Sequence, residues 1–210
     1  MMAVPPANEI TSNLNVSRET LDRLQVFSDL IRKWNQTINL IASSTLDQIW
    51  SRHIADSAAV FHAARVTDGS WVDLGAGAGL PGAVVAILAN ELAPALSVNC
   101  IESDVRKAAF IRTVARETGV PIGVITRRIE DAPPQFADIV SARALAPLPK
   151  LLEYCERHLK PGGRGVFPKG EAWQSEVSKA LESWRFTVET QPSRTHPGSA
   201  VLIVGDVERA

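Results

Sequence analysis

Residues 73–82 combine one acidic side chain with closely spaced glycines, directly after a short apolar run. The segment reads Asp-Leu-Gly-Ala-Gly-Ala-Gly-Leu-Pro-Gly, which is typical of a buried strand that turns sharply into a helix. Glu102 ends the next apolar run along the chain. Glycines that let the backbone approach a ligand, with a carboxylate at the neighbouring strand end, suit a small molecule with an adenosine end. The segment therefore predicts such a ligand at the carboxyl ends of parallel strands.

Two ligand classes fit this segment. An acid followed by the alternate glycines Gly75, Gly77 and Gly79 is typical of S-adenosylmethionine-dependent methyltransferases. Gly77, Gly79 and Gly82 also fit the G-x-G-x-x-G pattern of nicotinamide-dependent oxidoreductases. Asp73 favours the first class, because a carboxylate there can hold a cationic amino-acid ligand or order the loop amides, and would repel a pyrophosphate. A tight turn without a ligand is the plainer alternative.

Strands and helices alternate after residue 68. Apolar runs predict strands at 71–74, 97–101, 122–125, 138–141, 164–167, 187–190 and 201–204. Apolar periodicity predicts helices at 82–92, 105–118, 148–158 and 172–184. Strands separated by helices imply a mostly parallel sheet, and the last two strands predict an antiparallel hairpin at one edge. This is the α/β outline of a class I methyltransferase, Rossmann-like with a seven-stranded sheet.

The first 68 residues have a different pattern. Residues 17–34 carry apolar side chains at three- and four-residue steps, with Ser17 as an N-cap, and a second helix is expected at 46–60. We therefore expect an N-terminal helical extension at 1–68 and one compact Rossmann-like methyltransferase domain at 69–210. Residues 1–15 lack the basic and apolar parts of a signal peptide and are expected to be a mobile start.

Composition narrows the class of protein. The chain has 210 residues, 45% of them hydrophobic, and a net charge of −1, so an RNA partner would need a local basic face. Cys100 and Cys155 lack the spacing of a metal site or a disulfide framework, and a reducing cytoplasm is the expected location. No apolar run approaches the roughly 18 residues of a membrane span. Nothing indicates an obligate oligomer, and we expect a monomer.

Several short strings, taken together, resemble those of one family. They are Lys33-Trp34-Asn35, Arg52-His53-Ile54-Ala55-Asp56-Ser57, the Gly-Leu-Pro-Gly ending at 79–82, Arg128-Ile129-Glu130, Ser141-Ala142-Arg143-Ala144 and Pro168-Lys169-Gly170. In this order and spacing, residues 32–170 resemble the bacterial small-subunit ribosomal RNA guanine-N7 methyltransferases, the RsmG or GidB family. The resemblance implies S-adenosyl-L-methionine as cofactor and a guanine in the 530 loop of 16S ribosomal RNA as acceptor. The substrate form can be naked RNA or the small ribosomal subunit.

The expected site residues form three sets. The resemblance implies cofactor contacts at Gly75, Leu80, Glu102, Ile129, Glu130 and Arg143, and the glycine-rich segment adds Asp73 and Gly77. Basic residues near strand ends or on adjacent helices predict RNA contacts at Arg52, His53, Arg106, Lys107, Arg128 and Lys169. Arg143 and Lys169 are the residues expected to act in catalysis. Arg143 can hold the cofactor carboxylate or orient the base, and Lys169 is expected at the rim of the ligand site.

Guanine N7 carries a lone pair and no proton, so it can attack a sulfonium methyl group without a general base. The sequence is consistent with a reaction that needs no general base, because no nucleophile or base is apparent. Cys100 and Cys155 are expected to be packing residues. Tyr154 is followed four residues later by His158 instead of the lysine of reductases, which disfavours an oxidoreductase. A methyltransferase that acts on a small molecule or a protein is the alternative, and a non-enzymatic RNA-binding module is the third possibility.

Overall fold

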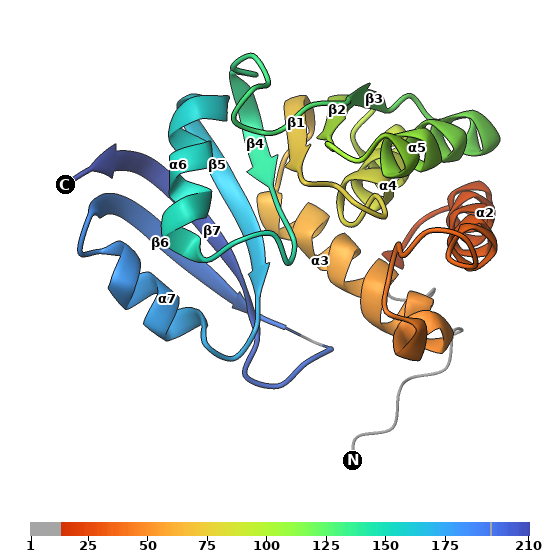
Figure 1. Ribbon diagram of the computed structural model, residues 1–210, viewed down its shortest axis with the longest axis horizontal. Coiled ribbons are helices and arrows are strands. Elements are labelled where there is room, and N and C mark those ends of the chain that lie inside the picture. Colours follow the sequence, from red (N-terminus) through yellow and green to blue (C-terminus); the bar gives the residue numbers. More distant parts are fainter. Residues whose placement is uncertain (1–13, 194) are drawn as a thin grey trace.

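Seven strands form one sheet in the order β3-β2-β1-β4-β5-β7-β6 in the computed structural model, which describes residues 14–193 and 195–210 (Figure 1). The strands are β1 (Asp68–Leu74), β2 (Ala95–Ile101), β3 (Gly123–Ile125), β4 (Ala137–Ser141), β5 (Leu159–Lys169), β6 (Trp184–Pro192) and β7 (Ala200–Arg209). The first five strands are parallel, and β7 runs antiparallel between β5 and β6. The predicted parallel sheet and its antiparallel edge are confirmed.

The helices after residue 68 agree closely with the pattern in the sequence. α4 (Gly82–Leu92), α5 (Val105–Thr118) and α6 (Leu148–His158) have the expected bounds. α7 (Trp173–Ala180) ends four residues before the expected position. The reason is that Trp184 begins β6, where its buried ring packs under the guanidinium of Arg209 at 4.7 Å.

Helices cover both faces of the sheet (Figure 1). Alternate strand residues divide between two hydrophobic clusters, because successive side chains of a strand point to opposite faces. Trp71 of β1 belongs to the cluster with α3 (Ala55–Ala64), α4 and α5, whereas Val72 belongs to the cluster with α6. All parallel strands therefore end at one edge between the two helical layers, where the candidate site residues lie.

The N-terminal helix α2 (Arg18–Trp34) packs against the first layer. The expected cap is confirmed, because the Ser17 hydroxyl accepts a hydrogen bond from the Thr20 amide at 3.3 Å. Phe27 and Trp34 place their rings 6.4 and 5.6 Å from the ring of Phe110 on α5. Trp34 is therefore a packing residue. The division of the chain at residue 68 stays a prediction, and the expectation for residues 1–13 lies outside the described residues.

The second expected helix differs most from the prediction. A single helix at 46–60 is wrong, since the chain forms a 3₁₀ helix η1 (Ser43–Gln48), a π-helix η2 (Ile49–Ile54) and then α3. The Thr45 hydroxyl donates to the Ala42 carbonyl at 2.8 Å, and such local bonds compete with regular α-helix. π-Helical turns are frequent at functional sites. Here the turn carries Arg52 and His53.

Replacing Phe110 with alanine tests the attachment of α2. Phe110 is fully buried, so Phe110→Ala is expected to lower the free energy of unfolding by about 3–5 kcal/mol in urea denaturation. Val105→Ala in the same helix is the control, because Val105 is 68% exposed and its loss should change stability by less than about 0.5 kcal/mol. Equal effects of the two substitutions would contradict this packing.

Candidate active site

Asp73 ties two strands to the helix that follows the glycine-rich segment. Its Oδ1 accepts from the Ser141 hydroxyl at 2.7 Å, and its Oδ2 accepts from the Gly82 amide at 3.0 Å. The Trp71 indole in turn donates to Ser141 Oγ at 2.8 Å. Burial raises the pKa of the fully buried Asp73 to about 7. The carboxylate therefore orders the loop, one of its two expected roles, and a direct contact to a ligand stays a prediction.

The glycine-rich segment uses backbone angles that favour glycine. Gly75, Gly77 and Gly79 have φ of +62°, +54° and +73°. A Cβ atom on Gly75 would lie 2.7 Å from Cδ1 of Leu145, in the segment that follows β4. A Cβ on Gly77 would meet only the Gly75 carbonyl, at 3.7 Å. The segment thus lies tightly against the end of β4 at Gly75 and more openly at Gly77.

Glu102 holds the same segment from the end of β2. Glu102 is only 8% exposed. Its Oε2 accepts a hydrogen bond from the Gly77 amide at 2.7 Å. Its Oε1 accepts from the Asp104 amide at 2.7 Å. Asp104, rather than Glu102, caps α5 by accepting from the Arg106 amide. Each carboxylate oxygen has a second lone pair, so the expected contact of Glu102 with the cofactor stays a prediction that this geometry permits.

Helix α6 holds the segment after β3 that contains two of the expected cofactor contacts, Ile129 and Glu130. The Tyr154 hydroxyl donates to Glu130 Oε1 at 2.5 Å, and His158 Nε2 donates to the Ile129 carbonyl at 3.1 Å. Burial and the Glu130 carboxylate raise the pKa of Tyr154 to about 12. Sequence reasoning used Tyr154 and His158 only as evidence against a reductase. Their structural role is to position Ile129 and Glu130.

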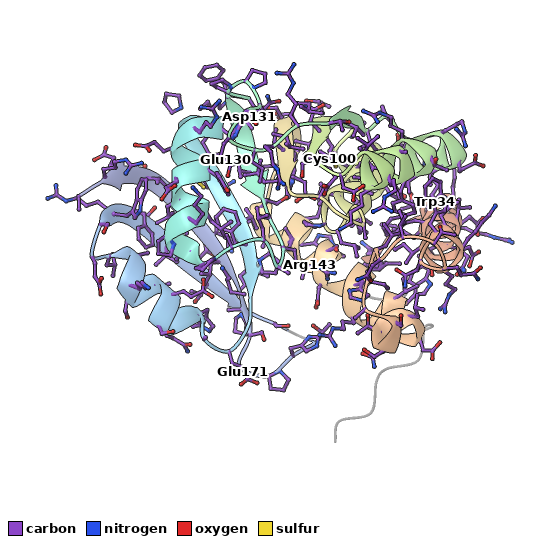
Figure 2. All side chains as sticks on the ribbon, in the orientation of Figure 1. Trp34, Cys100, Glu130, Asp131, Arg143 and Glu171 are labelled. Atoms are coloured by element: carbon purple, nitrogen blue, oxygen red, sulfur yellow. The ribbon has the colours of Figure 1, made fainter. Side chains whose placement is uncertain are left out.

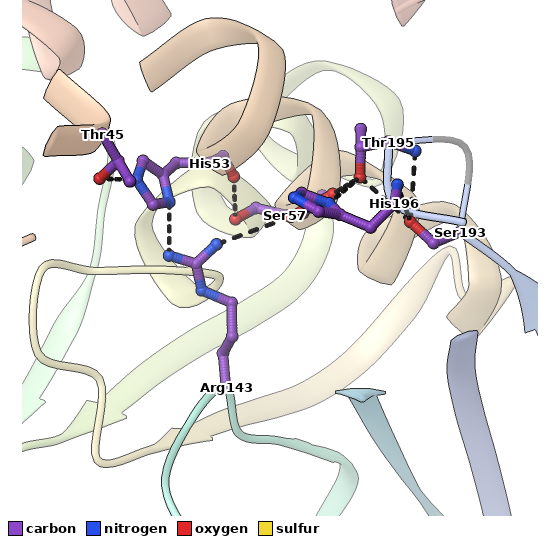
Figure 3. Close-up of polar contacts among 8 residues, drawn as sticks. Thr45, His53, Ser57, Arg143, Ser193, Thr195 and His196 are labelled. Carbon is purple, nitrogen blue, oxygen red and sulfur yellow. Dashed lines mark hydrogen bonds and ion pairs between the residues drawn. The ribbon is translucent and has the colours of Figure 1, made fainter. Parts of the chain in front are cut away.

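Arg143 lies between two polar partners from the N-terminal part of the chain (Figure 3). Its Nη2 lies 2.8 Å from Nδ1 of His53, and His53 Nε2 lies 2.9 Å from the Thr45 hydroxyl. Thr45 donates its only hydroxyl proton to Ala42, so it accepts from His53 Nε2, and Nδ1 is the unprotonated acceptor for Arg143. Burial, together with the charge of Arg143, lowers the pKa of His53 to about 4. His53 is therefore neutral.

Asp56 lies on the other side of Arg143. Its Oδ2 is 4.0 Å from Arg143 Nη1 and 4.0 Å from His196 Nδ1. The Thr195 hydroxyl donates a short hydrogen bond to Asp56 Oδ1. His53 and Asp56, three residues apart in the chain, thus both contact Arg143.

A cavity of about 1200 Å³ opens beside Arg143. Its lining includes four of the expected site residues and three polar residues that sequence reasoning did not assign to the site: Arg52, His53, Arg143, Lys169, Asp56, Glu176 and His196. The Lys169 ammonium donates to the Ala146 carbonyl at 2.8 Å and to Glu176 Oε2 at 2.7 Å. The carboxyl ends of β4 and β5 thus present two cations to one cavity.

The remaining expected RNA contacts lie elsewhere. Arg106 and Lys107 begin α5, and Arg128 follows β3, so none of the three lines the cavity. All three follow the carboxyl ends of β2 and β3, and their RNA contacts stay predictions. Figure 2 shows Trp34 well away from Arg143, in keeping with its packing role.

A sequence model of the family described as rRNA small subunit methyltransferase G matches residues 20–198. The chain belongs to this family. The methyltransferase is 50% identical over 196 residues to Ribosomal RNA small subunit methyltransferase G of Ruegeria sp. (strain TM1040), covering 93% of this chain and 95% of the relative. It is 49% identical over 208 residues to the protein of the same name from Ruegeria pomeroyi, covering 99% and 100%. The resemblance stated from the sequence is thereby confirmed.

Solved structures share the fold of this methyltransferase. A ribosomal protein L11 methylase from Lactobacillus delbrueckii subsp. bulgaricus matches with a TM-score of 0.59 and 17% identity, covering 74% of this chain and 78% of the other. A SAM-dependent O-methyltransferase from Thermotoga maritima matches with a TM-score of 0.55 and 15% identity, covering 88% and 72%. These likenesses confirm the class I methyltransferase fold.

Other expected features concern cysteines, metals and membranes. Cys100 and Cys155 are buried free thiols, and burial raises the pKa of both. Within residues 14–193 and 195–210 we find no cluster of three metal-ligating side chains. In the same described part of the chain, no helix combines the length and the hydropathy needed to cross a bilayer.

Sequence reasoning did not identify Thr45, Thr195 or Glu176 as part of the site. Each acts through a partner far along the chain or through a backbone group, for which the sequence carries no spacing signal. Asp56 had one available signal, its position one helical turn after His53. Its contact with Arg143 depends on the fold.

The neutral state of His53 makes stability depend on pH. The unfolded histidine takes up a proton near its ordinary pKa of 6.5, but the folded one does so only near 4. The stability contributed by neutral His53 is therefore complete above pH 6.5 and is lost as the pH falls toward 4, by at most about 3 kcal/mol. Urea denaturation of wild type and His53→Gln across this range is the measurement. The gap between them should shrink as the pH falls, and a constant gap would contradict the neutral assignment.

Proposed function

We propose that the protein transfers a methyl group from S-adenosyl-L-methionine to N7 of a guanine in the 530 loop of 16S ribosomal RNA. The proposal rests on one observation: in a chain of this family, the cavity that contains Arg143 and Lys169 adjoins the strand end against which the glycine-rich segment packs. A methyl donor and an acceptor base can therefore meet at the carboxyl end of β4.

The residues of the glycine-rich segment fit the proposed cofactor. Gly75 and Gly77 have positive φ angles in the turn that leads to Leu80, which lets the backbone approach a ligand closely, and Glu102 offers carboxylate lone pairs beside this turn. Ile129 and Glu130 are held in place for an adenine edge by α6. Bound there, S-adenosylmethionine supplies an electrophilic methyl group. Asp73 supports the site indirectly by holding the start of α4.

The cavity fits a guanine that needs no general base. Arg143 and Lys169 can donate hydrogen bonds to guanine O6, a usual partner of these side chains, while N7 keeps its lone pair. The carboxylates that line the cavity already accept from Thr195, Lys169 and the Leu148 amide, so they hold the site together. Because N7 lies in the deep groove of A-form RNA, the target guanine is expected to be unpaired. We assign a phosphate contact to Arg52, the exposed residue of the π-helical turn.

We place the protein in the cytoplasm as a monomer, where small ribosomal subunits are available as substrate. The helical extension at 1–68 then supplies one wall of the acceptor cavity through Arg52 and His53, and the domain at 69–210 supplies the cofactor site.

Methyl transfer from labelled S-adenosylmethionine to small ribosomal subunits that lack this modification tests the function. Label recovered as 7-methylguanosine from the 530 loop is the expected result. Naked 16S RNA in a parallel reaction decides which form is the substrate. Absence of label on either RNA, with S-adenosylmethionine binding intact, would favour the alternative of a small-molecule or protein acceptor.

Replacing Gly75 with valine tests the cofactor site. The added side chain would collide with Leu145 at a positive φ, so Gly75→Val is expected to lower S-adenosylmethionine affinity by roughly 100-fold or more in calorimetric titration. Gly119→Val is the matched control, because Gly119 also has a positive φ (+66°) but open space around its Cβ. The control should lose stability without losing affinity. Near-normal binding by Gly75→Val would contradict the role of the loop.

A further inference from the structure

Arg143 and Lys169, which both line the cavity, each face a carboxylate. Arg143 Nη1 lies 4.0 Å from Asp56 Oδ2, and Lys169 Nζ lies 2.7 Å from Glu176 Oε2. The carboxylates come from α3 and α7, on opposite faces of the sheet, so the pairing does not follow from one local motif. A site that only had to attract RNA phosphates would gain from unpaired cations. The pairing therefore points to the chemistry of the base.

The proposed reaction moves a positive charge. The N7 lone pair forms the new carbon–nitrogen bond, the electrons of the sulfur–carbon bond return to sulfur, and the charge of the sulfonium passes to the guanine ring. An uncompensated cation bonded to O6 would hold the neutral guanine but oppose the charge that develops in the transition state. Only interactions that favour the transition state over the bound substrate increase the rate of the chemical step.

The low exposure of Arg143 would strengthen the repulsion between an uncompensated guanidinium and the positive charge that develops on the guanine. The side chains of Arg143 and Asp56 are each 19% exposed, so water screens their charges only weakly. The other hydrogen-bond partner of Arg143, His53, is neutral. Among the described carboxylates, only that of Asp56 comes within 4.0 Å of the guanidinium. Asp56 therefore supplies the nearest compensating charge, and its effect on Arg143 exceeds that of the buried Asp73.

We propose that Asp56 is a positioning residue of the acceptor site whose carboxylate compensates the charge of Arg143, so that the guanidinium can hold the target guanine without opposing its methylation. Glu176 plays the corresponding part for Lys169. This inference rests on the proposed function, since it requires a neutral acceptor that becomes a cation.

Asp56→Asn separates charge from structure. Asparagine keeps an oxygen to accept from Thr195 and nearly the same volume, but it removes the negative charge. We expect kcat on small subunits to fall roughly 10- to 100-fold, whereas KM for the subunit stays unchanged or falls, because an added net positive charge does not weaken RNA binding. The affinity for S-adenosylmethionine should stay unchanged.

Two controls accompany this variant. Asp29→Asn makes the same substitution and the same change of net charge on the exposed surface of α2, and its kcat and KM should match the wild type. Thr195→Val removes the hydrogen bond to Asp56 but keeps the charge, so its kcat should exceed that of Asp56→Asn. In an Arg143→Gln background, adding Asp56→Asn should lower kcat by less than about threefold, because the guanidinium that lies 4.0 Å from Asp56 is already absent.

The outcomes are distinct. A wild-type kcat in Asp56→Asn would overturn the inference, and so would a raised KM in Asp56→Asn that Thr195→Val reproduces, which would make Asp56 only an anchor for residues 195–196. If Asp56→Asn does not fold, as judged by thermal denaturation, Asp56→Ser removes the same charge with a smaller side chain and carries the same expectation. If wild type forms 7-methylguanosine and these variants show no such split, the inference alone fails. If wild type forms none, the proposed function fails.

Discussion

The buried carboxylate of Asp73 is the interaction on which the arrangement of the site depends. A charge or polar group without water is costly unless hydrogen bonds replace its hydration, and here the Ser141 hydroxyl and the Gly82 amide supply them. These two donors belong to β4 and to the start of α4, so satisfying one carboxylate fixes the spacing of two strands and a helix. The glycine-rich segment, which leaves β1 at Asp73, is placed by the same bonds.

The acceptor side follows from the same strand end. Arg143 comes two residues after Ser141, so the strand that anchors Asp73 also delivers the guanidinium to the cavity. The guanidinium is then held by a neutral imidazole on one side and a carboxylate on the other. Because a planar guanidinium donates in fixed directions, this pair of partners defines which of its N–H groups face the cavity. The cofactor loop and the acceptor cavity are thus both held by polar contacts at the carboxyl end of β4.

Elements with strong local signals could be predicted well. α5 is an example, because Asp104 caps its start and Gly119 ends it in a left-handed conformation, both readable from residue type. The helix expected at 46–60 could not, because His53 in the π-helical turn donates a hydrogen bond to Thr45 and accepts one from Arg143, 90 residues away. Its residues alone have ordinary helical periodicity, and the contact of His53 with Arg143 arises only in the folded chain.

The sequence by itself determined the family, the order of strands and helices, and the glycine-rich turn, because each of these depends on residues adjacent in the chain or on a set of short strings. The tertiary structure decided what the polar groups do. Asp73 faces inward to Ser141, 68 residues away, and His53 meets Arg143 across 90 residues. Asp56 meets Thr195 across 139. Such contacts leave no periodic trace in the sequence, because the fold alone sets the distance and direction between the side chains.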